Sequence, residues 1–266
     1  MEGLVAGKVA VITGAGSGVG RAATQLFTRH GAKVVAADID LASAEETVAL
    51  VKAEGGEARV AACNVAEETA VIATVEAAVD AYGRLDIMYN NAGISASVGP
   101  DRKLKTLLET TIKDIERVEA VNVHGVIFGC QAAIRQFQRQ GGGGVIVNTA
   151  SIAGLIGFGG SAYGATKGAV VSLTRALALE WAALGIRVNS VCPAGMLTHF
   201  SGMDPQGANA EAIRSAMGSL YPLGHAIDPL DCANAALFLA SDLAASITGV
   251  NLPVDGGLAA GVKARR

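Results

Sequence analysis

Tyr163 and Lys167 stand four residues apart in the run Ser-Ala-Tyr-Gly-Ala-Thr-Lys-Gly-Ala, residues 161–169. In an α-helix this spacing places the phenol and the ammonium on one face. Two unit charges about 4 Å apart interact by roughly 4 kcal/mol at an effective dielectric near 20, and one pKa unit is about 1.4 kcal/mol. The ammonium is therefore expected to lower the pKa of the tyrosine from about 10 toward 7, where it can act as a general acid or base. In isolation, such a pair is more often a half-buried ring beside a solvated amine.

Short β-branched runs, which alternate with longer helical patterns, must position this pair. We expect strands at residues 8–13, 33–38, 58–62, 85–89, 144–149, 186–191 and 249–254. Near-continuous apolar strands joined by helices are typical of a parallel sheet covered on both faces. Right-handed crossovers then give a Rossmann-type, doubly wound α/β fold with seven parallel strands and ligands at their carboxyl ends. With no internal repeat or linker, residues 1–266 are expected to form one domain, with a substrate loop at about 193–225.

Composition argues against several classes of function. The chain is 51% apolar, which argues against disorder, and its net charge of −3 leaves no basic face for nucleic acid. Charged residues or glycine interrupt the apolar stretches within about ten residues, too few for a membrane span. The first residues resemble neither a signal peptide nor a transit peptide, so a cytoplasmic protein is expected.

The cysteines and histidines are scattered singly along the chain. No metal-ligand spacing links Cys63, Cys130, Cys192, Cys232, His30, His124, His199 and His225. We therefore expect buried free thiols and no metal site.

A glycine-rich turn joins the first expected strand to an amphipathic helix. Glycines there let the backbone approach a pyrophosphate, whose charge the helix N-terminus stabilises, so we expect cofactor contacts from Gly14, Ser17, Gly18, Val19 and Gly20. The second strand ends in Asp38, whose carboxylate can accept from the adenosine ribose and would repel a 2′-phosphate. Neither Ser17 nor Ile39 supplies a cation, so NAD is favoured over NADP. Asp38 is also a candidate cap for the helix that follows it.

In chain order, the glycine turn is followed by Asn90-Asn91-Ala92-Gly93, Asn122, Ser151 and Tyr163 with Lys167. This succession resembles the classical short-chain dehydrogenase/reductase family from residue 7 to about residue 257. The resemblance implies that Tyr163 is the catalytic acid/base and that Lys167 is its partner, which also holds the nicotinamide ribose. It further implies that Ser151 hydrogen-bonds the substrate oxygen and that Asn122 anchors a water in the proton path.

The resemblance also assigns the remainder of the cofactor site. It implies contacts from Asn64, Val65, Asn91, Ala92, Gly93, Tyr163, Lys167, Pro193, Met196 and Thr198. Two positions depart from the family pattern. Asn64 stands where an acid is common, and its amide oxygen can still accept from the adenine amino group. Ala194 stands where glycine usually follows the proline, and its methyl group is expected to restrict the turn near the nicotinamide.

Candidate substrate-site residues follow strand ends or belong to the long loop, and most of them are apolar. They are Ser95, Ser151, Ala153, Phe158, Tyr163, Gly195, Phe200, Met203 and Met217. This set favours a neutral secondary alcohol or ketone as the substrate, with cyclic and hydroaromatic molecules among the candidates, and hydride transfer to or from NAD. A 3-oxoacyl thioester reductase and a non-catalytic NAD-binding sensor on the same fold stay open as alternatives. The family commonly forms tetramers, so a homotetramer is expected, with a dimer as the next possibility.

Overall fold

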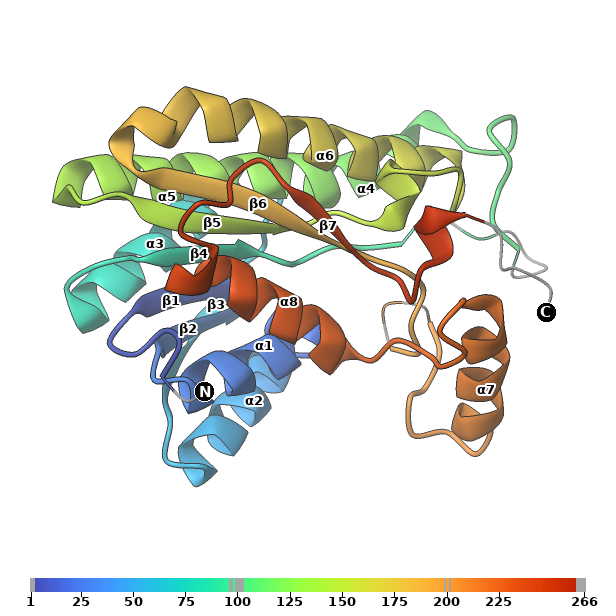
Figure 1. Cartoon of the computed structure of the whole chain (residues 1–266), viewed down its shortest axis with the longest axis horizontal. Helices are drawn as coiled ribbons and strands as arrows, with labels where there is room; N and C mark the ends of the chain where they lie inside the picture. Colours follow the sequence, from blue (N-terminus) through green and yellow to red (C-terminus); the bar gives the residue numbers. More distant parts are fainter. Residues whose placement is uncertain (1–2, 96–97, 99–102, 199, 201, 262–266) are drawn as a thin grey trace.

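The computed structural model describes residues 3–95, 98, 103–198, 200 and 202–261, and its described strands form one parallel sheet (Figure 1). The strands are β1 (Val9–Thr13), β2 (Lys33–Asp38), β3 (Glu57–Ala62), β4 (Ile87–Asn90), β5 (Gly144–Thr149), β6 (Ile186–Pro193) and β7 (Asn251–Val254). Their order in the sheet is β3-β2-β1-β4-β5-β6-β7. The predicted seven-stranded, doubly wound Rossmann-type fold is confirmed. The order reverses between β1 and β4, where such sheets open a crevice for ligands.

Helices cover both faces of the sheet. They are α1 (Gly18–Arg29), α2 (Leu41–Ala53), α3 (Glu68–Tyr82), α4 (Ile112–Glu119), α5 (Gly125–Gln140), α6 (Ser161–Trp181), α7 (Ala210–Leu220) and α8 (Pro229–Ala240). Figure 1 shows α1, α2 and α8 on one face and α3 to α6 on the other. Alternate residues of β1 therefore enter separate cores: Val9 and Val11 pack on the α3 side, and Ala10 and Ile12 on the α1 side. No described helix has both the length and the apolarity needed to cross a membrane.

The segment after β6 differs from the expected loop in its second half. Helix α7 occupies residues 210–220 and stands apart from the sheet, at the right-hand side of Figure 1. The sequence does contain apolar residues at helical spacing, namely Ala210, Ile213 and Met217. The Gly and Pro residues around them favoured a loop prediction instead. The expected loop is therefore an irregular stretch followed by a short helix.

A buried polar chain joins the centre of the sheet to its helices. The Asn90 amide donates to Asn148 Oδ1 at 2.9 Å, and the Asn148 amide donates to Thr174 Oγ1 at 3.1 Å. Helix α5 crosses Asn90 at Gly129, where a Cβ atom would lie 1.8 Å from Asn90 Oδ1. Only glycine permits this close approach of helix and strand.

We expect Gly129→Ala to destabilise the protein by more than about 2 kcal/mol, because the new methyl group must displace a buried, hydrogen-bonded amide. Gly168→Ala is the matched control, since a Cβ atom at Gly168 in α6 meets nothing within 4 Å. The control should be neutral or should stabilise by up to about 1 kcal/mol through helix propensity. Urea unfolding measures both, and equal stabilities for the two variants would contradict the packing argument.

Candidate active site

A cavity of about 660 Å³ lies at the carboxyl ends of the strands, where the sheet order reverses. Most of the predicted site residues line it: Gly14, Ser17, Gly18, Val19, Asp38, Asn64, Val65, Asn91, Ala92, Gly93, Ser95, Ser151, Phe158, Tyr163, Lys167, Pro193, Gly195, Met196, Thr198, Phe200 and Met217. Four predicted residues are not among those that line it: Gly20, Asn122, Ala153 and Met203. The fold therefore brings the glycine turn, Asp38 and the Tyr163–Lys167 pair to one cavity.

The glycine turn is shaped by two left-handed residues and one tight contact. Gly14 has φ of 67° and Gly18 has φ of 48°, values that favour glycine. A Cβ atom at Gly20 would lie 1.9 Å from the Gly14 carbonyl oxygen. Gly20 thus serves the packing of α1 on the turn and is not among the residues that line the cavity, while its contact with a cofactor stays a prediction.

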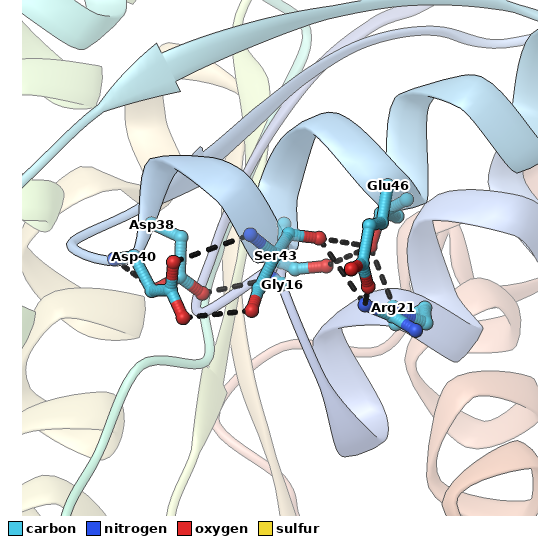
Figure 2. A network of polar contacts seen from close by, with 8 residues as sticks. Gly16, Arg21, Asp38, Asp40, Ser43 and Glu46 are labelled. Atoms are coloured by element: carbon cyan, nitrogen blue, oxygen red, sulfur yellow. Dashed lines mark hydrogen bonds and ion pairs between the residues drawn. The ribbon is translucent and has the colours of Figure 1, made fainter.

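The Asp38 carboxylate lies at the same end of the cavity as the glycine turn, where backbone amides hold it. Its Oδ2 accepts from the Gly16 amide at 2.8 Å, and its Oδ1 accepts from the Asp40 amide at 2.9 Å. The cap of α2 is Asp40, which accepts from the Ser43 backbone amide at 3.2 Å and from the Ser43 hydroxyl at 2.7 Å. Asp38 is therefore not the helix cap, and Figure 2 shows Asp40 rather than Asp38 bound to Ser43. The Asp38 carboxylate lines the cavity.

The guanidinium near this carboxylate is bound to a different element. Arg21 in α1 donates to Thr47 Oγ1 at 2.9 Å and to the Ser43 carbonyl at 3.2 Å. It also pairs with Glu46 at 3.0 Å, as Figure 2 shows. These contacts fasten α1 to α2 and hold the Arg21 charge there.

The other end of the cavity carries the predicted catalytic groups. Lys167 is buried, and its ammonium donates to the Thr149 carbonyl at 2.8 Å and lies 5.7 Å from the centre of the Tyr163 ring. The Ser151 hydroxyl donates to the Pro193 carbonyl at 3.2 Å and accepts from the Ala153 amide at 3.1 Å. Strand β5 thus delivers Ser151 and the carbonyl of Thr149, while the first two turns of α6 deliver Tyr163 and Lys167.

Burial dominates the pKa of both members of the pair. It raises the pKa of Tyr163 to about 12, against a smaller lowering by a hydrogen bond with Ser151. It lowers the pKa of Lys167 to about 8. The expected lowering of the Tyr163 pKa by Lys167 is thus wrong for the protein's own groups. The ammonium is directed at a backbone carbonyl and lies beside the ring, so its attraction does not offset desolvation of the phenolate.

Asn122 lies one layer behind the cavity. It belongs to a π-helical turn, Ala120–His124, between α4 and α5. Its side chain is fully buried, accepts from the Ile94 amide at 2.8 Å and donates to the Ile94 carbonyl at 2.9 Å. A longer bond of 3.3 Å reaches Thr166 in α6. Asn122 thus ties the backbone after β4 to α6. Its expected role as the anchor of a water in the proton path stays a prediction.

The substrate end of the cavity is apolar and aromatic. The Phe200 and Tyr163 rings are 6.0 Å apart and inclined by 59°. Among the described residues that line the whole cavity, Asp38 and Lys167 carry the only charges. A neutral molecule suits this end.

Several lining residues were missed by the sequence analysis. Thr149 could have been found, because it precedes Ser151 at the end of β5. Cys63 similarly precedes Asn64 at the end of β3, and burial raises the pKa of its thiol. Ile94, Leu104, Val121 and Gly159 also line the cavity, and nothing in their local sequence marks them. Their positions follow from the long-range packing of the segments between β4 and α6.

The described cysteines and histidines give no ligand cluster. All four cysteines are free and buried. No group of three or more His, Cys, Asp or Glu side chains in the described part of the chain could hold a metal ion. His199 lies outside the described residues.

Comparisons with known proteins agree with this site and fold. A family model described as enoyl-(acyl carrier protein) reductase matches residues 14–259. The chain is 39% identical to 2,5-dichloro-2,5-cyclohexadiene-1,4-diol dehydrogenase LinX of Sphingobium indicum, over 98% of the chain and 100% of that protein. It is 41% identical to meso-2,3-butanediol dehydrogenase of Serratia marcescens, over 95% of each.

Solved structures give the same result. A short-chain type dehydrogenase/reductase from Mycobacterium marinum superposes with a TM-score of 0.85 at 32% identity, covering 96% of each chain. Levodione reductase superposes with a TM-score of 0.85 at 31% identity, covering 97% of this chain and 99% of its own. Because the likeness in sequence and structure extends over nearly the whole chain, the protein belongs to the classical short-chain dehydrogenase/reductase family of oxidoreductases.

Proposed function

We propose that the protein is an NAD-dependent oxidoreductase that interconverts a secondary alcohol and a ketone, with Tyr163 as general acid/base. One observation carries the proposal. A single cavity joins Asp38 and the glycine turn at one end to Ser151, Tyr163 and Lys167 at an apolar end. This is the arrangement that hydride transfer between a nucleotide cofactor and a small neutral molecule requires.

The residues fit a dinucleotide. A Cβ atom at Gly18 would meet only the Thr198 side chain, at 3.7 Å, so the start of α1 is open on the cavity side. Backbone amides and the positive end of the helix dipole suit a pyrophosphate there. The cofactor's own chemistry is acceptance or donation of a hydride, together with a positive charge on the oxidised nicotinamide.

Charge at the Asp38 end supports NAD over NADP. The Asp38 carboxylate is oriented by two backbone amides and keeps acceptor capacity for ribose hydroxyls. A 2′-phosphate would meet this like charge, and the Arg21 guanidinium is engaged by Glu46 and Thr47 on α2.

Asp38→Ala should therefore lower the ratio of the protein's affinity for NADH to its affinity for NADPH. We expect NADH affinity to fall by roughly 10- to 150-fold, because a charge-assisted hydrogen bond is worth roughly 1.5–3 kcal/mol, while NADPH affinity rises. Fluorescence titration with each reduced cofactor measures this directly. Glu45→Ala, which removes an exposed carboxylate from the same region of α2, is the matched control and should keep the wild-type ratio. An unchanged ratio in Asp38→Ala would refute the assignment.

The residues at the apolar end can move and hold a proton. With a pKa near 12, Tyr163 is protonated at neutral pH and is a donor toward a developing alkoxide during ketone reduction. In the oxidative direction its phenolate takes the proton of the alcohol. The Ser151 hydroxyl donates to the Pro193 carbonyl at 3.2 Å. On turning from that carbonyl to a substrate oxygen it would supply a second donor, and such positioned donors stabilise developing negative charge by a few kcal/mol.

Tyr163→Phe tests this mechanism. The substitution removes the hydroxyl with little change in shape, so we expect turnover to fall by about 10²–10⁴-fold. NADH affinity should stay within about twofold, because nothing else at the site changes. The measurement is the 340 nm absorbance change across cyclic secondary alcohols, open-chain diols, their ketones and a 3-oxoacyl thioester. Retained turnover in the variant would exclude Tyr163 as the acid/base.

The nature of the pocket supports a compact neutral substrate, and a cyclic or hydroaromatic one in particular. Phe158, Phe200, Met196 and Met217 line the end that carries Tyr163. Among the relatives, one is named for a cyclohexadiene diol and another for an open-chain butanediol. Faster turnover of a thioester than of every ring substrate in the panel would instead favour an acyl thioester reductase.

Burial of Lys167 favours an enzyme over a cofactor sensor. Because its pKa falls to about 8 on burial, the folded chain holds the protonated amine less readily than the unfolded chain does. Such a cost in stability is typical of functional groups. A sensor that only binds the cofactor has no need of an amine beside a buried phenol.

This burial has a measurable pH signature. The unfolded pKa of lysine is about 10.5 and the folded value about 8, so between these values the unfolded state binds more protons and stability rises with pH. Relative to Lys167→Met, the wild-type protein should gain up to about 1.4 kcal/mol per pH unit from pH 8 to 10. Urea unfolding at several pH values gives this difference. Lys52→Met, which removes an exposed lysine of α2, should follow the wild type, and parallel curves for wild type and Lys167→Met would contradict the assignment.

A homotetramer remains our proposal for the assembly, with a dimer as the alternative. Leu179 in α6 is 84% exposed and Leu184 just beyond it is 49% exposed, which supports contact with another copy at this helix.

A further inference from the structure

A small apolar cluster lies beneath α7, separate from the two cores on the sheet faces. Its buried members are Ile152, Ala194, Tyr221, Ile227 and Cys232. Ile152 is the neighbour of Ser151, and Ala194 is the neighbour of Gly195. The Ala194 methyl is buried in this cluster, where it joins the turn after β6 to the C-terminal end of α7.

Tyr221 fastens the two parts of this cluster together. It follows the last residue of α7 and is 2% exposed. Its hydroxyl donates to the Gly195 carbonyl at 2.5 Å. On its other side, Gly256 has φ of 58°, and a Cβ atom there would lie 3.0 Å from Tyr221 Cβ. The chain after β7 therefore packs against the base of the Tyr221 side chain, and the Gly256 carbonyl accepts from the Leu223 amide at 3.0 Å. At its other end, the Tyr221 hydroxyl holds the turn after β6.

Apart from this cluster, helix α7 is held by the Arg214 guanidinium, which donates to the Pro205 carbonyl at 2.9 Å, and by close packing of Gly218 on His225 and Ala226. Ala210 and Gly218 are its only buried residues, and Figure 1 shows it standing away from the sheet and its covering helices. Met217 nevertheless lines the cavity. Met217 packs against the buried cluster that contains Tyr221, so the position of Met217 depends on that of Tyr221.

Gly195 leaves space where these groups converge. A Cβ atom on Gly195 would lie 3.3 Å from Tyr221 Oη, 3.4 Å from Met217 Cε and 3.9 Å from Phe158 Cζ. Gly195, Met217 and Phe158 all line the cavity, whereas Tyr221 lies behind them. Tyr221 therefore helps to position the residues that form the wall of the cavity at its substrate end, although Tyr221 itself does not line the cavity.

We propose that Tyr221 is a positioning residue for substrate: by holding the Gly195 carbonyl, its hydroxyl sets α7 and Met217 against the turn after β6. This inference rests on the proposed function for its kinetic consequence. In Tyr221→Phe the Gly195 carbonyl loses the Tyr221 hydroxyl, and the loss of a hydrogen bond to this half-buried acceptor shifts an equilibrium by about tenfold. The α7 segment should then leave its closed position more often, without any change at Tyr163.

The kinetic test compares Tyr221→Phe with Tyr82→Phe. Tyr82 ends α3, and its ring lies 5.4 Å from the Lys33 ammonium, on an element distant from the cavity, so the control makes the same chemical change elsewhere. We expect Tyr221→Phe to raise the KM of the best substrate by about tenfold, with kcat reduced less than threefold and NADH affinity within twofold. Tyr82→Phe should match the wild type in all three values.

A second readout does not depend on turnover. Arg214, in the middle of α7, is the only Lys or Arg between Arg187 and Lys263, so trypsin reports opening of this segment through a single cut. Cleavage after Arg214 should be about tenfold faster in Tyr221→Phe than in the wild type or in Tyr82→Phe, because proteolysis follows the population of the open form. Gly195→Ala keeps the carbonyl acceptor but adds a methyl group 3.3 Å from Tyr221 Oη, so we expect it to raise the KM of ring substrates.

The outcomes separate the two proposals. A wild-type KM or a wild-type cleavage rate in Tyr221→Phe overturns the positioning role. An absence of turnover in the wild-type protein across the whole panel overturns the proposed function. Without turnover, the cleavage rate alone tests whether the Tyr221 hydroxyl holds α7 in place, and a wild-type rate in Tyr221→Phe would contradict it.

Discussion

All the strands of the sheet run in the same direction, and this constraint underlies the whole site. Parallel strands deliver their carboxyl ends to one edge, so β1, β2, β5 and β6 bring the glycine turn, Asp38, Ser151 and Pro193 to a common cavity. Reversal of the strand order between β1 and β4 sends their following helices to opposite faces and leaves space between the turns. The two ends of the cavity therefore differ in chemistry. One end is built from the segments that follow β1 and β2, and the other is built from the segments that follow β5 and β6.

Desolvation governs the chemistry at the end that carries Tyr163. Burial holds the phenol protonated and lowers the pKa of the Lys167 ammonium, while the Thr149 carbonyl supplies that ammonium with a partner. At the opposite end, the Asp38 carboxylate receives two backbone amides and lies nearer to solvent. The same fold thus buries a phenol at one end of the cavity and presents a carboxylate, oriented by backbone amides, at the other.

The groups that face the cavity depend on a layer of residues that do not. Gly20 lets α1 sit on the glycine turn, Asn122 ties the backbone of Ile94 to α6, and Tyr221 ties α7 to Gly195. Each support is a backbone contact, either a carbonyl or amide that needs a partner or a space that admits no side chain. Loss of such a support alters the geometry of the site without altering its chemistry, which is why binding and turnover can respond separately.

The sequence by itself determined the parallel fold, the glycine turn, Asp38 and the order of Ser151, Tyr163 and Lys167, because local patterns and fixed spacings specify these features. It also predicted most of the residues that line the cavity. Only the tertiary structure decided the direction of the Tyr163 pKa, the placement of Asn122 behind the cavity, the helix at residues 210–220 and the role of Tyr221. These depend on burial and on contacts between residues far apart in the chain, such as Tyr221 with Gly195 and Asn122 with Ile94, and no local pattern encodes such contacts.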